Sequence, residues 1–235
     1  MDPSAKPVLV IAPHPDDEIL GVGGTIAKYT NMGWPVTVLT VSGHTPPLYS
    51  PGVYEGTVEE ALKAHALVGV TDSRFLELPC TMLGTVPVHE LNGLILEAVR
   101  SVEPAIVLCP YPDRHIDHRL VFDATMVATR PVDVGRNIEI LAAYETLSET
   151  HWNAPHIEPN FVPNWVVDVT DFLEIKKQAL ACYVSQISEF PGPRSVEANI
   201  ALATLRGTRQ DSHMERGCIS FECARDRLRL RMSTS

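Results

Sequence analysis

Residues 8–18 read VLVIAPHPDDE, an unbroken apolar run followed at once by an imidazole and three carboxylates. The five apolar residues at 8–12 predict a strand that is buried on both faces, as strands of parallel sheets are. In open α/β sheets, ligands bind beyond the carboxyl ends of the strands. A strand that ends in His and Asp side chains therefore predicts a metal-binding site at that edge of a sheet.

A second polar cluster, His115-Ile116-Asp117-His118, follows another predicted strand at residues 105–109. Carboxyl ends of parallel strands meet at one edge of the sheet, so we expect the two clusters to form one shared site.

The rest of the chain alternates between strand and helix patterns. We expect strands at residues 36–41, 74–78, 138–143 and 165–169, and helices at residues 19–32, 58–68, 88–102, 117–129, 170–184 and 196–205. Residues 43–56, rich in Pro, Gly, Ser and Tyr, predict a long loop. This alternation predicts the α/β class, with a mostly parallel sheet covered on both faces. We expect one domain over residues 1–235, with a helical, basic tail at residues 205–235.

The composition is typical of a globular protein, with 45% hydrophobic and 20% charged residues. No stretch approaches the roughly 18 apolar residues of a membrane span, and the N-terminus lacks the pattern of a signal peptide. The net charge of −10 argues against nucleic-acid binding. The five cysteines form no CxxC pair, which favours a reducing compartment. We therefore expect a cytoplasmic protein without a membrane span or a nucleic-acid partner.

Three residues are candidate zinc ligands: His14, Asp17 and His118. Zinc hydrolases usually keep three protein ligands and one open position for water. His14 and Asp17 lie three residues apart on a tight turn, and His118 is the natural third ligand from the other strand end. Bound zinc lowers the pKa of its water to about 7. Iron or cobalt could replace zinc, because these ligand types discriminate poorly among such ions.

Asp16, His115 and Asp117 remain for proton transfer. Asp16 is a candidate general base, and His115 could stabilise an oxyanion or protonate a leaving amine. Asp117 could orient an imidazole and raise its pKa. With a metal ion, these groups supply the parts needed to hydrolyse an amide. The competing interpretation is structural, since acidic residues before a helix often cap its N-terminus. Glu18 is expected only to support a neighbouring group.

A dinucleotide site is the other interpretation of this strand-to-helix turn. Gly21, Gly23 and Gly24 do not match the G-x-G-x-x-G fingerprint, and three carboxylates at the turn would repel a pyrophosphate. We interpret these glycines as positions of close helix-to-sheet packing.

Both motifs resemble those of the PIG-L/LmbE-like N-acetylglucosamine deacetylases: residues 14–18 look like the first motif and residues 115–118 like the second. Segments around residues 144–146, 183–186 and 193–195 also look like those of bacterial members. The resemblance implies a Rossmann-like, three-layer α/β/α fold. It also implies zinc-dependent removal of an N-acetyl group from an amino sugar or glycoconjugate. Members of such families often associate, so a homo-oligomer is a mild expectation.

By matching positions, the resemblance assigns zinc binding to His14, Asp17 and His118. It assigns the role of general base to Asp16. It implies that His115 assists the tetrahedral intermediate and that Asp117 tunes the imidazole of His115.

The chain departs from the family pattern where many members carry an Arg just before a Glu-Glu-Ala element. Here residues 56–58 read GTV before that element at residues 59–61. Arg194 is a candidate substitute for this substrate contact. Three further candidates for substrate binding are Tyr144, Glu145 and His44. Two alternatives stay open: the same metal hydrolase acting on a non-sugar amide, and a non-catalytic sugar-binding protein.

Overall fold

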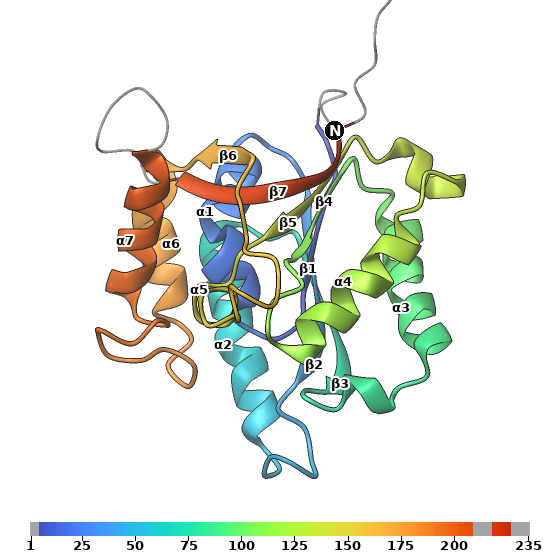
Figure 1. Ribbon diagram of the computed structural model, residues 1–235, viewed down its shortest axis with the longest axis horizontal. Coiled ribbons are helices and arrows are strands. Elements are labelled where there is room, and N and C mark those ends of the chain that lie inside the picture. Colours follow the sequence, from blue (N-terminus) through green and yellow to red (C-terminus); the bar gives the residue numbers. More distant parts are fainter. Residues whose placement is uncertain (1–4, 209–217, 227–235) are drawn as a thin grey trace, which may run out of the picture.

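The computed structural model describes residues 5–208 and the backbone of residues 218–226. Its seven-stranded sheet has the order β3-β2-β1-β4-β5-β7-β6 (Figure 1). Five parallel strands form most of it: β3 (Asp72–Pro79), β2 (Val36–Gly43), β1 (Val8–Ala12), β4 (Ile106–Pro110) and β5 (Ile140–Tyr144). β7 (Cys218–Asp226) lies antiparallel between β5 and β6 (Trp165–Asp168).

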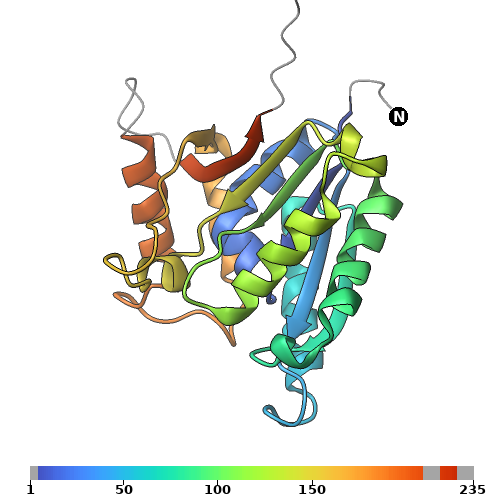
Figure 2. The ribbon, with the colours of Figure 1, turned by 45° about the vertical axis from the view of Figure 1, so that its right-hand side comes forward.

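Helices cover both faces of the sheet, which makes three layers (Figures 1 and 2). One layer holds α1 (Asp17–Asn31), α2 (Val53–Val68) and α6 (Leu173–Leu180), with α7 (Val196–Gly207) beside α6. The other layer holds α3 (Val88–Val102) and α4 (Ile116–Ala128), which pack on each other. The short helix α5 (Leu147–His151) follows β5. The three-layer α/β/α fold with a mostly parallel sheet is thus confirmed.

β1 is apolar throughout because both of its faces are covered. Val8 and Val10 belong to the core under α1 and α2, whereas Leu9 and Ile11 belong to the core under α3 and α4. Each of the four is at most 1% exposed. Full burial of such a side chain contributes about 1.5–3 kcal/mol, so this strand anchors both cores.

The two polar motifs lie at the point where the strand order reverses. β1 and β4 are adjacent parallel strands, with Val8 paired to Ile106. The chain leaves β1 towards β2 on one side and leaves β4 towards β5 on the other. The two connections diverge beyond the carboxyl ends of these strands, and such a switch point is where α/β folds bind ligands.

The glycines of α1 serve close packing, as interpreted from the sequence. A Cβ at Gly21 would lie 2.2 Å from the ring of Tyr144, and one at Gly24 would lie 2.9 Å from the side chain of Val169. Larger residues at either position would push α1 away from its neighbours.

The structure corrects the sequence prediction in three places. α2 begins at Val53, so the loop expected at residues 43–56 is shorter. α5 was not expected. The prediction of a helical tail is wrong for residues 218–226, which form β7 because they pair with β5 on one side and β6 on the other. The other parts of the expected tail, residues 209–217 and 227–235, lie outside the described residues.

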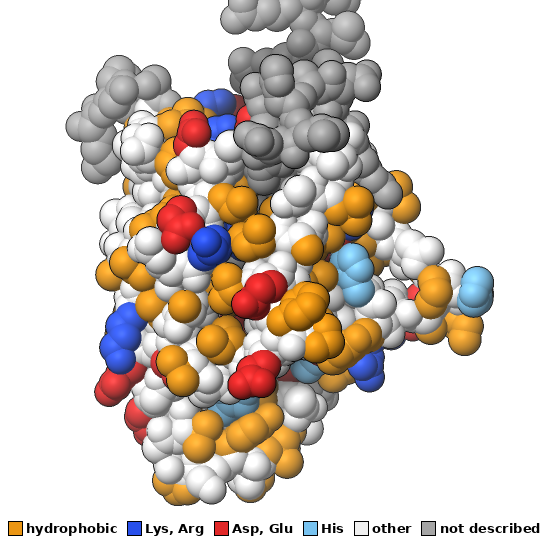
Figure 3. Space-filling view, turned by 90° about the vertical axis from the view of Figure 1, so that its left-hand side faces the viewer, with side chains coloured by type: hydrophobic (Ala, Val, Ile, Leu, Met, Phe, Trp, Pro, Cys, Tyr) orange, Lys and Arg blue, Asp and Glu red, His pale blue; other side chains and the backbone are white. Residues whose placement is uncertain are grey.

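The face on which α7 lies carries apolar side chains interspersed with charges of both signs (Figure 3). Leu205 on α7 is 56% exposed. Across the described chain, no helix has the length and apolar character that crossing a membrane requires.

Lys176 on α6 is a buried residue that links α6 to α1. Its side chain is 4% exposed, in a layer whose core is mainly apolar. Its ammonium donates a 2.8 Å hydrogen bond to the carbonyl of Leu20, beside a kink of α1 at Val22. Burial lowers the pKa of Lys176 to about 8, although the charge of Glu145 opposes the shift.

We predict that this lysine makes stability depend on alkaline pH. Between pH about 8 and the ordinary lysine pKa of 10.5, the unfolded chain binds more protons than the folded one. The free energy of unfolding should therefore increase by up to roughly 3 kcal/mol because of this residue as the pH rises through that range. Urea unfolding of wild type and Lys176→Met at several pH values measures the difference. Lys177→Met, on the same helix, should keep the wild-type slope; equal slopes in all three proteins would contradict the prediction.

Candidate metal centre and active site

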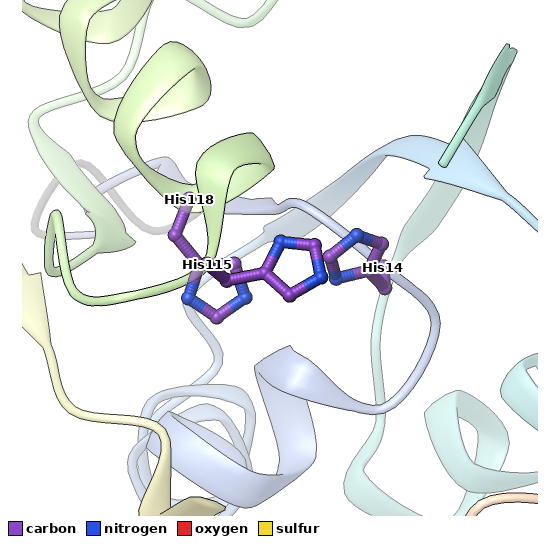
Figure 4. Close-up of side chains that lie close together, drawn as sticks. All are labelled: His14, His115 and His118. Carbon is purple, nitrogen blue, oxygen red and sulfur yellow. The ribbon is translucent and has the colours of Figure 1, made fainter. Parts of the chain in front are cut away.

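Three imidazoles converge beyond the ends of β1 and β4 (Figure 4). His14 comes from the turn after β1, while His115 and His118 come from the start of α4. One ring nitrogen of each lies within 4.8 Å of the others, so the group could hold a metal ion. The rings of His14 and His115 are 4.6 Å apart at their centroids. The structure thus brings the two sequence motifs into one site.

Asp17 joins His14 to His118. Its Oδ2 accepts a 3.0 Å hydrogen bond from the backbone N–H of His14, and it lies 3.0 Å from Nδ1 of that ring. The same oxygen is 3.3 Å from Nε2 of His118. Three buried atoms of the described site have no hydrogen-bond partner: Oδ1 of Asp17, Oδ1 of Asp117 and Nε2 of His118. A carboxylate oxygen and an imidazole nitrogen left unpaired side by side fit the donor set of a zinc-type cation.

The electrostatics of this group describe a site that attracts positive charge. Burial disfavours the charged form of His14, yet hydrogen bonds to Asp117 and Asp17 raise its pKa to about 9. Burial likewise opposes a charge on His118, but Asp17 and Asp113 raise its pKa to about 10. Despite its own burial, Asp17 has a pKa well below the usual range because of His118 and His14. The carboxylates thus dominate the potential at the site.

Asp16 is not used to cap the helix that it precedes. It occupies the N-cap position of α1, but its side chain makes no capping hydrogen bond. Instead its Oδ2 lies 3.4 Å from Nη1 of Arg194. Burial raises the pKa of Asp16 to about 8, with Arg194 opposing the shift and Asp17 and Glu18 adding to it. This placement counts against the capping interpretation and leaves a carboxylate free for proton transfer.

His115 is held as a neutral imidazole. Its Nδ1 accepts a 3.2 Å hydrogen bond from the backbone N–H of Asp117 at the start of α4. Burial, with help from His14 and His118, lowers its pKa to about 4. With Nδ1 used as an acceptor, the proton of the neutral ring belongs on Nε2, which can donate one hydrogen bond.

The carboxylate of Asp117 serves a different imidazole from the one expected. Its Oδ2 lies 2.9 Å from Nε2 of His14, and it also accepts the backbone N–H of Thr81. Only its backbone N–H reaches His115. The carboxylate of Asp117 therefore orients His14, and it acts on the ring of His115 only through its charge.

Asp113 is the site residue that sequence reasoning missed. It is fully buried, and its Oδ2 lies 3.0 Å from Nδ1 of His118 and accepts a 2.9 Å hydrogen bond from Thr150. Its Oδ1 accepts the backbone N–H of His115. Carboxylates commonly fix the orientation of metal-binding histidines in this way. Its position two residues before the second motif was the only available signal.

The four candidate substrate residues separate into two pairs. Arg194 lies beside Asp16. His44 lies near the site as well: burial lowers its pKa, and the charges of His14 and Arg194 add to that shift. In contrast, Tyr144 is fully buried and donates a hydrogen bond to the carbonyl of Ile11, so the expectation that it lines a substrate pocket is wrong.

Glu145 departs from the expectation as well. It is 4% exposed and accepts two hydrogen bonds from the guanidinium of Arg206. It borders a separate cavity of about 200 Å³, together with residues such as His151 and Phe161. Its carboxylate is therefore committed to an ion pair with α7.

Comparison with known proteins places the chain among deacetylases. The family model PIG-L, described as GlcNAc-PI de-N-acetylase, matches residues 9–129. Diacetylchitobiose deacetylase of Thermococcus kodakarensis is 31% identical over 202 residues, covering 78% of this chain and 71% of its own. A 1D-myo-inositol 2-acetamido-2-deoxy-alpha-D-glucopyranoside deacetylase of Acidothermus cellulolyticus is 25% identical, covering 78% and 80%.

The fold comparison extends the likeness to the whole chain. The crystal structure of the conserved protein TT1542 from Thermus thermophilus is similar with a TM-score of 0.76 and 26% identity. The match covers 97% of this chain and 99% of that one. The matched family span, residues 9–129, contains both polar motifs, all of β4 and all of β1 except Val8. The chain belongs to the PIG-L family of de-N-acetylases.

Proposed function

We propose that this protein is a zinc-dependent hydrolase that removes the N-acetyl group of an amino sugar or glycoconjugate. The observation that carries the proposal is the buried Asp17, which joins two imidazoles and leaves one oxygen unpartnered, beside an Asp16 that caps nothing. The relatives named as deacetylases of acetamido sugars support the choice of substrate class.

His14, Asp17 and His118 are the proposed zinc ligands, with His115 close enough to take part in binding a metal. A zinc ion held there would supply Lewis acidity towards the amide carbonyl and would acidify a water molecule. Asp117 and Asp113 hold the imidazoles of His14 and His118 from behind. Each imidazole is thereby fixed in one orientation before any ion binds.

Asp16 is the proposed general base. A water molecule attacking the acetyl carbonyl carbon must lose a proton, and a carboxylate oxygen of Asp16 takes it. The proton then passes to the nitrogen of the leaving amine, so the C–N bond breaks to give acetate and a free amino sugar. Because its environment is nearly dry, the carboxyl has a pKa close to neutral, as efficient proton transfer in both directions requires.

His115 is the proposed donor to the oxyanion. Its Nδ1 is occupied by the N–H of Asp117, so Nε2 presents the proton. One such preorganised donor typically contributes about 10²–10³ in rate. Its side chain is only partly buried, and Arg194 is 28% exposed, which marks the side from which a substrate can approach. Arg194 and His44 are the proposed contacts for the sugar.

We predict that two substitutions separate metal binding from proton transfer. His118→Ala should lose bound zinc and all acetate release, because it removes a proposed ligand. Asp16→Asn should keep about one zinc per chain while its kcat falls by roughly 10²–10⁴. Elemental analysis and acetate release from N-acetylglucosamine and its conjugates, with and without a chelator, measure both. His89→Ala, an exposed histidine on α3, is the control and should behave as wild type.

Three results would contradict the proposal. Full turnover by Asp16→Asn would remove Asp16 as the base. Acetate release that a chelator does not affect would reject a role for the metal. Zinc binding without release from any acetylated amino sugar would reject the sugar substrate, and the same assay on N-acetylated amino acids would then test non-sugar amides.

We predict that Asp113 supports metal affinity without binding the ion. Asp113→Asn should weaken zinc affinity by about 10–100-fold, because His118 loses the carboxylate that fixes its ring. Competition against a zinc-sensitive dye measures the affinity. Asp123→Asn, an exposed position on α4, the helix that carries His118, should leave the zinc affinity unchanged. Equal affinities for the two variants would show that Asp113 is only a structural partner of Thr150.

A further inference from the structure

Asp16 has a backbone conformation that its neighbours must enforce. Its φ is +117°, in the region that residues with a Cβ rarely adopt. Strained conformations of this kind persist only where the surrounding structure holds them, and they cluster at active sites. With this backbone conformation the Asp16 side chain lies towards Arg194 and does not cap the helix end.

Glu18 contacts the strained residue directly. Its Oε2 accepts a 3.2 Å hydrogen bond from the backbone N–H of Asp16. Glu18 is fully buried in the first turn of α1. This bond fixes the peptide plane before Asp16, and thereby opposes relaxation of φ towards ordinary values.

Two further side chains hold Glu18 from other elements. The hydroxyl of Tyr183, in the turn after α6, donates to Oε1 of Glu18. Nε2 of His65, on α2, lies 3.4 Å from the same oxygen, and its Nδ1 is 2.8 Å from the hydroxyl of Ser73 on β3. Tyr183 and His65 are 0% and 2% exposed. A buried network of four side chains thus ends at the backbone of Asp16.

Packing alone does not explain a carboxylate at this position. Glu18 lies beside Asp16 and Asp17, and burying like charges together is unfavourable unless each is hydrogen-bonded. An apolar side chain would fill the space without that cost. Burial and the charge of Glu18 hold the pKa of Tyr183 well above its usual range, so its hydroxyl keeps the proton that it donates. Buried hydrogen-bond networks specify geometry, and Glu18 uses both of its oxygens, one towards Tyr183 and one towards the N–H of Asp16.

We propose that Tyr183 and His65, acting through Glu18, are positioning residues that hold Asp16 in its strained conformation. The inference rests on the proposed function for the role of Asp16 as base. The network contacts Asp16 through that backbone N–H, and the charge of Glu18 also raises the pKa of the Asp16 carboxyl.

The test compares two buried tyrosines of the same core. Tyr183→Phe removes the hydroxyl that holds Glu18, whereas Tyr144→Phe removes an equally buried hydroxyl that bonds to Ile11 on β1. Tyr183→Phe should lower kcat by about tenfold or more, since small misplacements of catalytic groups are costly, with KM and zinc content unchanged. Tyr144→Phe should keep the wild-type kcat. Equal losses in both variants, or no loss in Tyr183→Phe, would overturn the proposal.

A second readout does not depend on turnover. Hydrogen exchange of the Asp16 amide, followed by NMR on the zinc-loaded protein, reports its bond to Glu18 directly. Exchange should be at least tenfold faster in Tyr183→Phe than in wild type or Tyr144→Phe, and unchanged exchange would overturn the proposal. If Tyr183→Phe does not fold, Glu18→Leu replaces it in the exchange measurement with the same expectation, because leucine offers no acceptor to the N–H of Asp16. A wild-type protein that releases no acetate rejects the proposed function, while the exchange comparison still decides whether the network holds Asp16.

Discussion

The carboxylate of Asp17 is the interaction on which the site depends. One of its oxygens contacts the backbone and ring of His14 and the ring of His118, so it ties the end of β1 to the start of α4. A fully buried carboxylate is tolerated only when it is paired this closely. The parallel pairing of β1 with β4 brings these partners within reach, which makes the strand order of the sheet a condition of the chemistry.

Much of this arrangement could be predicted from sequence because it is local. The apolar run at residues 8–12 and the polar residues after it predict both a buried strand and the edge where the site lies. The same holds for the strand before residues 115–118. Only the adjacency of the two strands needed the fold, and the structure supplies it through the pairing of Val8 with Ile106.

What the sequence could not reveal depends on contacts between distant segments. Tyr144 looked like a pocket residue at a strand end, yet α1 approaches so closely at Gly21 that its ring is enclosed. Asp117 is two residues from His115, but the turn directs its carboxylate to His14 instead. β7 was missed because a strand of this kind is specified by its partners, here β5 and β6, more than by its own pattern.

The three consecutive carboxylates of the first motif show how one helix start can divide their roles. Asp16 precedes the first turn with a positive φ, and its side chain leaves the helix towards Arg194. Asp17, one residue on, faces the imidazoles. Glu18 turns back to the N–H of Asp16 and inward to Tyr183. Successive helical residues point about 100° apart, so adjacent side chains reach different surroundings. A metal ligand, a proton acceptor and a structural support therefore need no separate segments, and any shift in the helix start would displace all three together.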